Sequence, residues 1–72
     1  MTHHIKILDV VALSRPLEKQ GLDRGLVGTV VEQLADHVFE VEFSDEDGRT
    51  YATAAVPADQ LIVLRYKPVQ AA

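Results

Sequence analysis

The sequence predicts an all-β protein, a small five-stranded SH3-like barrel with a long first loop and a 3₁₀ turn before its last strand. Five short runs rich in β-branched and aromatic residues alternate with Gly, Pro and Asp turn signals. No segment has the apolar spacing of a long amphipathic helix. Because sequential hairpins can close a small sheet without a crossover helix, these observations favour a barrel. A chain of 72 residues leaves room for one small domain of modest stability.

The first predicted strand is Ile5–Leu13, which is rich in β-branched residues, is interrupted by Asp9 and is expected to be buried on both faces for part of its length. The segment Ser14–Gly25 is predicted as a long loop because it contains most of the polar residues of the first half. A short helix in this segment would give an α+β fold. Pro16 and Gly21, so close together, make the helix the weaker alternative.

The second predicted strand is Leu26–Ala35. Strict alternation places Glu32 on the same side as Val30 and Leu34. Since a carboxylate is not expected among buried apolar residues, the pattern predicts a bend or bulge, which we expect near Gly28.

The third predicted strand, Val38–Phe43, follows a polar break and has the clearest pattern in the chain. Its two phenylalanines share one side with Val41, whereas Glu40 and Glu42 lie on the other. Burying each phenylalanine stabilises by roughly 1.5–3 kcal/mol, and burying an unpaired carboxylate costs several kcal/mol. We therefore expect the aromatic side inward and the glutamates outward, with the register of neighbouring strands set accordingly.

The remaining elements follow from turn signals. Asp47-Gly48 is the strongest hairpin signal in the chain, and Pro57 suits the first position of a single 3₁₀ turn. The predicted elements are a turn over Ser44–Arg49, a strand over Thr50–Val56, the 3₁₀ turn over Pro57–Gln60 and a strand over Leu61–Tyr66. The fifth strand is an exposed edge that would be able to pair two copies. The expected organisation is a flexible N-terminus over 1–4, one domain over 5–66 and a flexible tail over 67–72.

Composition excludes several classes of protein. The chain has no cysteine, which rules out disulfides and thiolate chemistry. No apolar run approaches the roughly 20 residues that cross a bilayer, and the first residues lack a secretory signal. A cytoplasmic protein without membrane association is expected.

No combination of residues predicts catalysis. His3 and His4 lie at the N-terminus and His37 in a turn, so no metal-ligand spacing is present. Ser14 and Ser44 each lie in a loop without a nearby histidine. We therefore expect a protein that is not an enzyme, with no cofactor and no metal.

Two acidic features have alternative interpretations. The turn sequence contains Asp-x-Asp-Gly but lacks the later ligands of a calcium loop, which favours a plain hairpin turn. Asp9 would be able to act as a general base, but it is better interpreted as an acceptor of backbone hydrogen bonds at the mouth of the first loop.

Charge is distributed unevenly along the chain. The net charge is −4, yet six acidic residues and no Lys or Arg lie between Asp36 and Asp47. This acidic hairpin would repel a phosphate backbone and attract a basic protein. The candidate partner-binding residues are Glu40, Glu42, Asp45, Glu46 and Asp47. The alternative is that these carboxylates only keep a small sheet soluble.

A second candidate surface is basic. Arg15, Lys19 and Arg24 lie in the first loop and would be able to hold a carboxylate or phosphate. Glu18 and Asp23 are interleaved with them, which also fits a mixed, solvated loop. Tyr51 and Tyr66 would add contact area, although Tyr51 suits a core position equally well. With two tyrosines and no tryptophan, a proline-peptide groove is a poor interpretation.

Several blocks of the sequence resemble a known family. "LDVVAL", "GLDRGLVGTVVE" and "FEVEFSDEDGRTYATAAVPADQL" resemble, in order and spacing, the short bacterial proteins catalogued as domain of unknown function number 4926. The resemblance covers Ile5–Leu64 and implies an SH3-like barrel without established activity, with members that can lie beside genes of toxin–antitoxin type. A more distant similarity, through Gly25, Gly28 and Val30, is to KOW-type barrels, but glycines needed for backbone shape explain that pattern better.

Two function classes follow. The first is a protein-interaction module that presents its acidic hairpin to a basic partner, in the manner of an antitoxin or immunity protein. The second is a KOW-like, nucleic-acid-associated barrel that binds through Arg15, Lys19 and Arg24 with Arg49. The first is favoured, with a protein partner rather than nucleic acid and with the chain as a monomer or weak homodimer.

Overall fold

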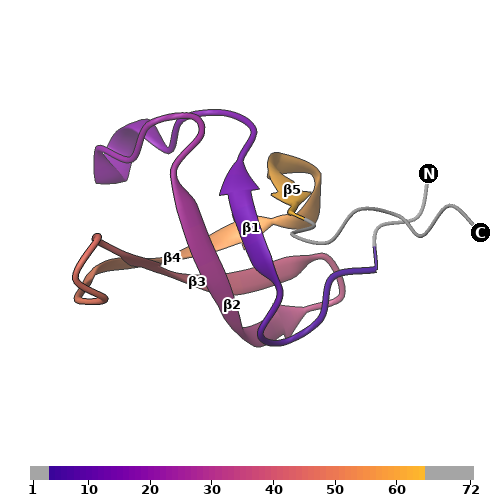
Figure 1. Ribbon diagram of the computed structural model, residues 1–72. Coiled ribbons are helices and arrows are strands. Elements are labelled where there is room, and N and C mark those ends of the chain that lie inside the picture. Colours follow the sequence, from indigo (N-terminus) through magenta and orange to yellow (C-terminus); the bar gives the residue numbers. More distant parts are fainter. Residues whose placement is uncertain (1–3, 65–72) are drawn as a thin grey trace, which may run out of the picture.

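The computed structural model describes residues 4–64. Five antiparallel strands form one sheet in the order β4-β3-β2-β1-β5 (Figure 1), and residues 4–64 contain no α-helix. The elements are β1 (Val10–Leu13), η1 (Glu18–Gln20), β2 (Val27–Ala35), β3 (Val38–Ser44), β4 (Thr50–Pro57), η2 (Ala58–Gln60) and β5 (Leu61–Val63). The predicted all-β class and small five-stranded barrel, with a long first loop and a 3₁₀ turn before the last strand, are confirmed.

The sheet curls around one hydrophobic core. Phe39, Val41 and Phe43 of β3 all point inward, the last two fully buried. The remaining core residues are Ile5, Val11, Leu13, Leu22, Val30, Ala54, Val56, Ala58 and Leu61. The inward orientation of both phenylalanines is therefore confirmed, and it leaves the glutamates of β3 outside.

The first strand is shorter than predicted. Residues Ile5–Asp9 do not form a strand, because the Asp9 carboxylate accepts a hydrogen bond from the Lys6 backbone N–H at 2.9 Å. The Asp9 N–H donates to the Lys6 carbonyl at 3.0 Å, which closes a turn with Leu8 at a φ of 77°. A local side-chain bond of this kind competes with a sheet ladder. Asp9 is thus a backbone acceptor, as predicted, but in the turn before β1 and not at the mouth of the first loop.

The long first loop is an ordered excursion, defined here as residues 14–26. The backbone groups of Leu17 and Leu22 exchange hydrogen bonds at 2.7 and 3.1 Å. Between them η1 ends at Gly21, whose φ of 70° suits glycine. Leu22 is buried in the core, which ties the excursion to the barrel. The helical alternative is thereby reduced to one 3₁₀ turn.

The bulges of β2 lie further along the strand than predicted. The β2–β3 register shifts once between Val30 and Glu32 and again between Gln33 and Ala35. Gly28 itself pairs regularly with Phe43. The predicted irregularity of β2 is therefore present, but its extra residues are Val31 and Leu34, beyond Gly28.

Backbone hydrogen bonds around η2 position the last strand of the sheet. The Ala58 N–H donates to the His37 carbonyl at 2.7 Å, and the Ser14 N–H donates to the Gln60 carbonyl at 2.9 Å. These bonds hold η2 against the β2–β3 turn and the end of β1, so that β5 pairs with β1. Strand β5 ends at Val63. Residues 1–3 and 65–72, which include Tyr66 and the predicted tail, lie outside the described residues.

Candidate functional site

The outer face of β3 carries the first group of candidate residues. Glu40 and Glu42 are half-buried between the neighbouring strands. Glu42 pairs with Thr29 of β2, and Glu40 pairs with Glu32 of β2. Sequence reasoning missed Glu32 as a member of this surface. We call Glu32, Glu40 and Glu42 the acidic face.

The bulge at Val31 explains why Glu32 belongs to the acidic face. Val30 points inward opposite Val41, so strict alternation would also point Glu32 inward. One extra residue reverses the alternation and leaves Glu32 exposed, directly opposite Glu40. Directly opposed side chains have Cβ atoms about 4.5–5.5 Å apart, where like charges destabilise a sheet. The conflict of Glu32 with its strand pattern was the signal that would have found it.

The turn between β3 and β4 holds the second group. The Asp45 Oδ1 accepts hydrogen bonds from the backbone N–H groups of Asp47, at 2.9 Å, and Arg49, at 3.0 Å. The Gly48 N–H donates to the Asp45 carbonyl, and Gly48 has a φ of 80°. Asp45 therefore organises the hairpin turn, as expected of a plain turn. The Oδ1 atom of Asp45 is thus engaged within the chain and is not free to bind a partner.

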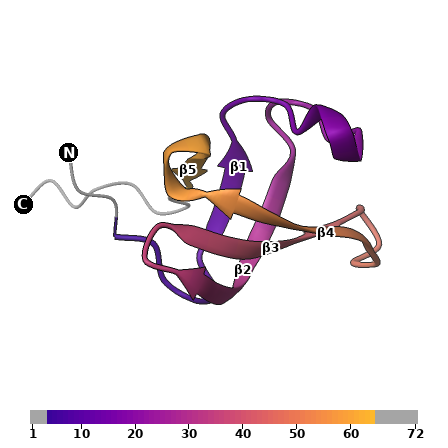
Figure 2. The same ribbon diagram turned by 180° about the vertical axis from the view of Figure 1, so that it is seen from behind.

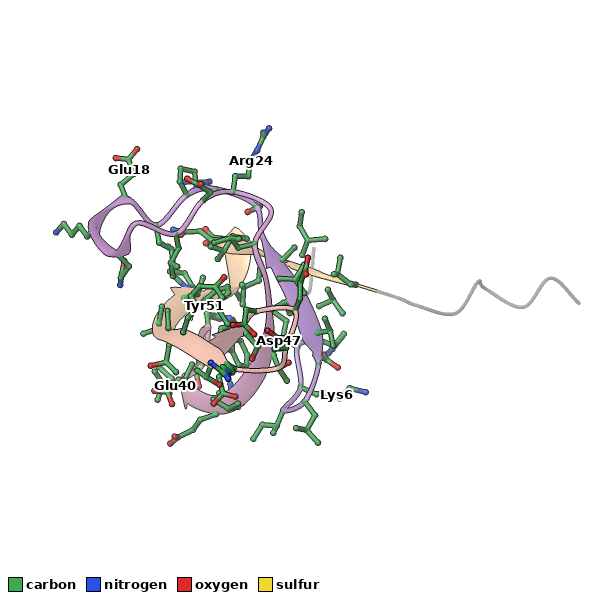
Figure 3. All side chains as sticks on the ribbon, turned by 60° about the vertical axis from the view of Figure 1, so that its left-hand side comes forward. Lys6, Glu18, Arg24, Glu40, Asp47 and Tyr51 are labelled. Atoms are coloured by element: carbon green, nitrogen blue, oxygen red, sulfur yellow. The ribbon has the colours of Figure 1, made fainter. Side chains whose placement is uncertain are left out.

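The five predicted acidic residues fall into two groups on one hairpin, with Glu40 and Glu42 on β3 and Asp45, Glu46 and Asp47 in the turn that follows. Glu46 and Asp47 are exposed at the turn, whereas Glu40 lies on the strand. Figure 3 shows Glu40 and Asp47 at separate places on the molecule. The acidic face and the turn are thus two neighbouring parts of one hairpin, and only the acidic face brings carboxylates of two strands together.

The basic residues lie on the excursion. Arg15, Lys19 and Arg24 are all exposed. Hydrogen bonds at Leu13 and Leu17 on either side of Arg15 hold the two limbs of the excursion together, which places Arg24 on the limb facing Arg15. Lys19 lies at the tip in η1.

Acidic side chains accompany these basic residues. Glu18 and Asp23 are exposed on the same excursion. Figure 3 shows Glu18 and Arg24 both pointing away from the sheet. The excursion therefore presents mixed charge, which fits the interpretation of a solvated loop.

Other candidate residues are dispersed. His37 is exposed in the β2–β3 turn, and Ser44 is exposed at the end of β3. Tyr51 is 50% exposed and does not belong to the core. Within residues 4–64, no group of three or more His, Cys, Asp or Glu side chains is arranged to hold a metal ion. No helix in this part of the chain is long and apolar enough to cross a membrane.

Comparison with known proteins identifies one family. The family model described as "Domain of unknown function (DUF4926)" matches residues 7–63. The match spans every strand of the barrel, the excursion and the acidic hairpin. No curated protein and no solved structure gives a significant match to the chain.

Proposed function

The chain belongs to the DUF4926 family, and we propose from its own surface that this member is a protein-interaction module that binds a basic partner through the acidic face. An antitoxin or immunity-type role, in which the partner is a basic toxin, fits this proposal. The proposed location is the cytoplasm, and the module performs no chemistry itself.

The observation that carries the proposal is the opposition of Glu32 and Glu40 across β2 and β3. Two like charges at this separation destabilise the free chain. A Lys or Arg of a partner that lies between the two carboxylates replaces this repulsion by attraction. Binding of a basic partner therefore stabilises the acidic face, whose carboxylates repel each other in the isolated barrel. Complementary charge also speeds the encounter of the two proteins.

Position on the sheet supports the same proposal. Glu40 and Glu42 lie on the middle strand of the β2–β3–β4 part of the sheet, where their backbone is held on both sides. Side chains on a strand paired at both edges are better ordered than those on a loop, which favours a specific contact. The turn residues Glu46 and Asp47 extend the negative potential beyond this ordered group.

The test compares two charge-reversed variants. Glu40→Lys with Glu42→Lys should keep the β-sheet circular dichroism spectrum and abolish capture of the natural partner from a lysate of the source cells. The matched control, Glu18→Lys with Asp23→Lys, makes the same change in net charge on the excursion and should capture the partner normally. Undiminished capture by the acidic-face variant would dismiss the acidic face as the binding surface.

The alternative function is nucleic-acid binding through Arg15, Lys19 and Arg24, and it is tested with the same protein. Titration with single- and double-stranded RNA and DNA at low salt should give no binding, since the basic residues are few and interleaved with acids. Binding that weakens with salt, and that is lost when all three basic residues are replaced by alanine, would transfer the function to the excursion.

A further inference from the structure

Strand β4 is an open edge of the sheet. It pairs with β3 on one side, and the sheet order places no strand on the other. Among residues 4–64, no backbone hydrogen bond outside the β3–β4 ladder reaches Thr50–Pro57. Figure 2 shows β4 in the foreground, with β3 along one of its sides. An edge of this kind is a template for pairing with another strand.

The register identifies which backbone groups are free. The Ala58 N–H donates to the His37 carbonyl, toward β3. Because backbone groups alternate in direction along a strand, those of Val56 and Ala54 also face β3. The N–H and C=O groups of Thr53 and Ala55 therefore point away from it. The side chains of both residues are exposed on the outer face of the sheet.

The edge carries little protection against pairing. No charged residue occurs from Thr50 to Ala58. Natural edge strands are usually guarded by Lys, Pro or a bulge. Here the register shift lies at the start of β4, beside Tyr51, and Pro57 is its last residue. The segment between them is regular, uncharged and free of proline.

We propose that this edge pairs with the β4 edge of a second copy of the chain, antiparallel and with the two-fold axis at Ala54. In this register Thr53 lies opposite Ala55 of the second copy, so the outward N–H and C=O groups of the two residues bond each other. The two sheets then continue as one. The inference uses backbone groups of the β4 edge and not the carboxylates of the acidic face, which lie on the neighbouring strands, with Glu40 opposite Ala55 and Glu42 opposite Thr53.

Charge identifies a second copy as the occupant. Arg49 immediately precedes β4 and Asp59 lies in η2 just beyond it, so the strand has opposite charges at its two ends. Antiparallel pairing about Ala54 brings the Arg49 end of each strand toward the Asp59 end of the other. The strand is thus complementary to itself.

The first experiment measures the mass of the full chain by sedimentation equilibrium over increasing concentration. The mass should rise from 7.9 kDa toward twice that value. Ala55→Lys, which places a charge at the centre of the edge, should keep the mass at one chain. The control Val27→Lys places the same charge on the exposed outer side of β2, away from the edge, and should leave the association unchanged. A chain that stays monomeric at millimolar concentration would overturn the proposal, as would association unaffected by Ala55→Lys.

The second experiment tests the register with conservative substitutions. The natural chain has no cysteine, so Thr53→Cys and Ala55→Cys each introduce a single thiol. In the proposed register these thiols lie opposite each other with Cα atoms about 5.5 Å apart, within disulfide range. An oxidised equimolar mixture should therefore contain several-fold more mixed disulfide than either same-variant disulfide.

Mass spectrometry distinguishes the disulfide products, because the two variants differ in mass. Ile7→Cys, exposed and remote in sequence from β4, gives the level of random collision. If the mixed disulfide of Thr53→Cys and Ala55→Cys is no more abundant than the disulfide of Ile7→Cys, the pairing is refuted even if the chain dimerises. A dimer that cross-links through Ile7→Cys instead would assign the interface to another surface.

Discussion

Glu32 on β2 lies directly opposite Glu40 on β3, with both side chains on the outside of the sheet. The bulge at Val31 exchanges one free-energy cost for another. A regular strand would point Glu32 into the core, where an unpaired carboxylate costs several kcal/mol. The bulged strand replaces this with a like-charge pair at the surface, which costs less than about 1 kcal/mol. The bulged strand therefore has the lower free-energy cost, and it places Glu32 on the acidic face.

Removing one charge of this pair should stabilise the protein. Glu32→Gln is expected to raise the free energy of unfolding by about 0.2–1 kcal/mol, because the repulsion from Glu40 disappears. Urea denaturation at low salt measures the difference. The gain should shrink in 1 M salt, where screening already weakens the repulsion. Glu46→Gln, in the turn, is the control and should change stability less. A loss of stability in Glu32→Gln would contradict the repulsive pairing.

Gly28 should not tolerate a side chain. A Cβ at this position would lie 2.6 Å from the Val41 Cγ1, 2.8 Å from the Glu42 carbonyl oxygen and 2.9 Å from the Phe43 Cδ1. Gly28→Ala is therefore expected to lower the free energy of unfolding by about 1–3 kcal/mol. In a Val41→Ala background the nearest contact is gone, so the loss should be smaller there. Strictly additive losses in the double-mutant cycle would show that contact with Val41 is not the cause.

Replacing Leu8 with glycine should stabilise the protein. Its φ of 77° lies in the left-handed region, and its side chain is 74% exposed, so little burial is lost on its removal. The left-handed backbone costs a non-glycine residue roughly 1–2 kcal/mol, and the entropy of an added glycine offsets about half of that. Leu8→Gly is expected to raise the free energy of unfolding by about 0.5–1 kcal/mol. Thermal unfolding measures the change. Ile7→Gly, which relieves no left-handed backbone, should lower stability; equal effects at both positions would exclude strain at Leu8.

The sequence predicts those parts of the fold that depend on one strand at a time. The alternation of Phe39 and Phe43 with Glu40 and Glu42 identifies the buried side of β3 without reference to any neighbour. The position of the bulge is different, because it depends on the register with β3. For this reason the conflict at Glu32 was visible in the sequence, whereas its opposition to Glu40 was not.

Local hydrogen bonds and tertiary contacts limit the prediction elsewhere. The β propensity of Ile5–Leu13 is overridden where the Asp9 carboxylate bonds the Lys6 N–H. The order of the excursion depends on the burial of Leu22, which no pattern within the loop reveals. Charge counting found the acidic residues of the turn but did not separate Asp45, which binds the backbone, from Asp47, which does not.

Asp45 should be important for stability, in contrast to its acidic neighbours. Its Oδ1 accepts two backbone N–H bonds, from Asp47 and Arg49, and both are lost in Asp45→Ala. A hydrogen bond contributes about 0.5–1.5 kcal/mol, and the exposure of this turn places each bond at the lower end, so a total loss of about 1–2 kcal/mol is expected. Urea denaturation measures it. Asp45→Asn keeps an acceptor oxygen and should recover most of the loss.

Asp47→Ala is the matched control for Asp45, since it removes the same charge from the same turn. No side-chain hydrogen bond of Asp47 is recorded in the described part of the chain, so its stability should remain within about 0.5 kcal/mol of the natural protein. If the acidic face binds the partner, both variants should retain capture under conditions where they are folded. A large loss of stability in Asp47→Ala would mean that charge in the turn, and not the Asp45 hydrogen bonds, holds the hairpin together.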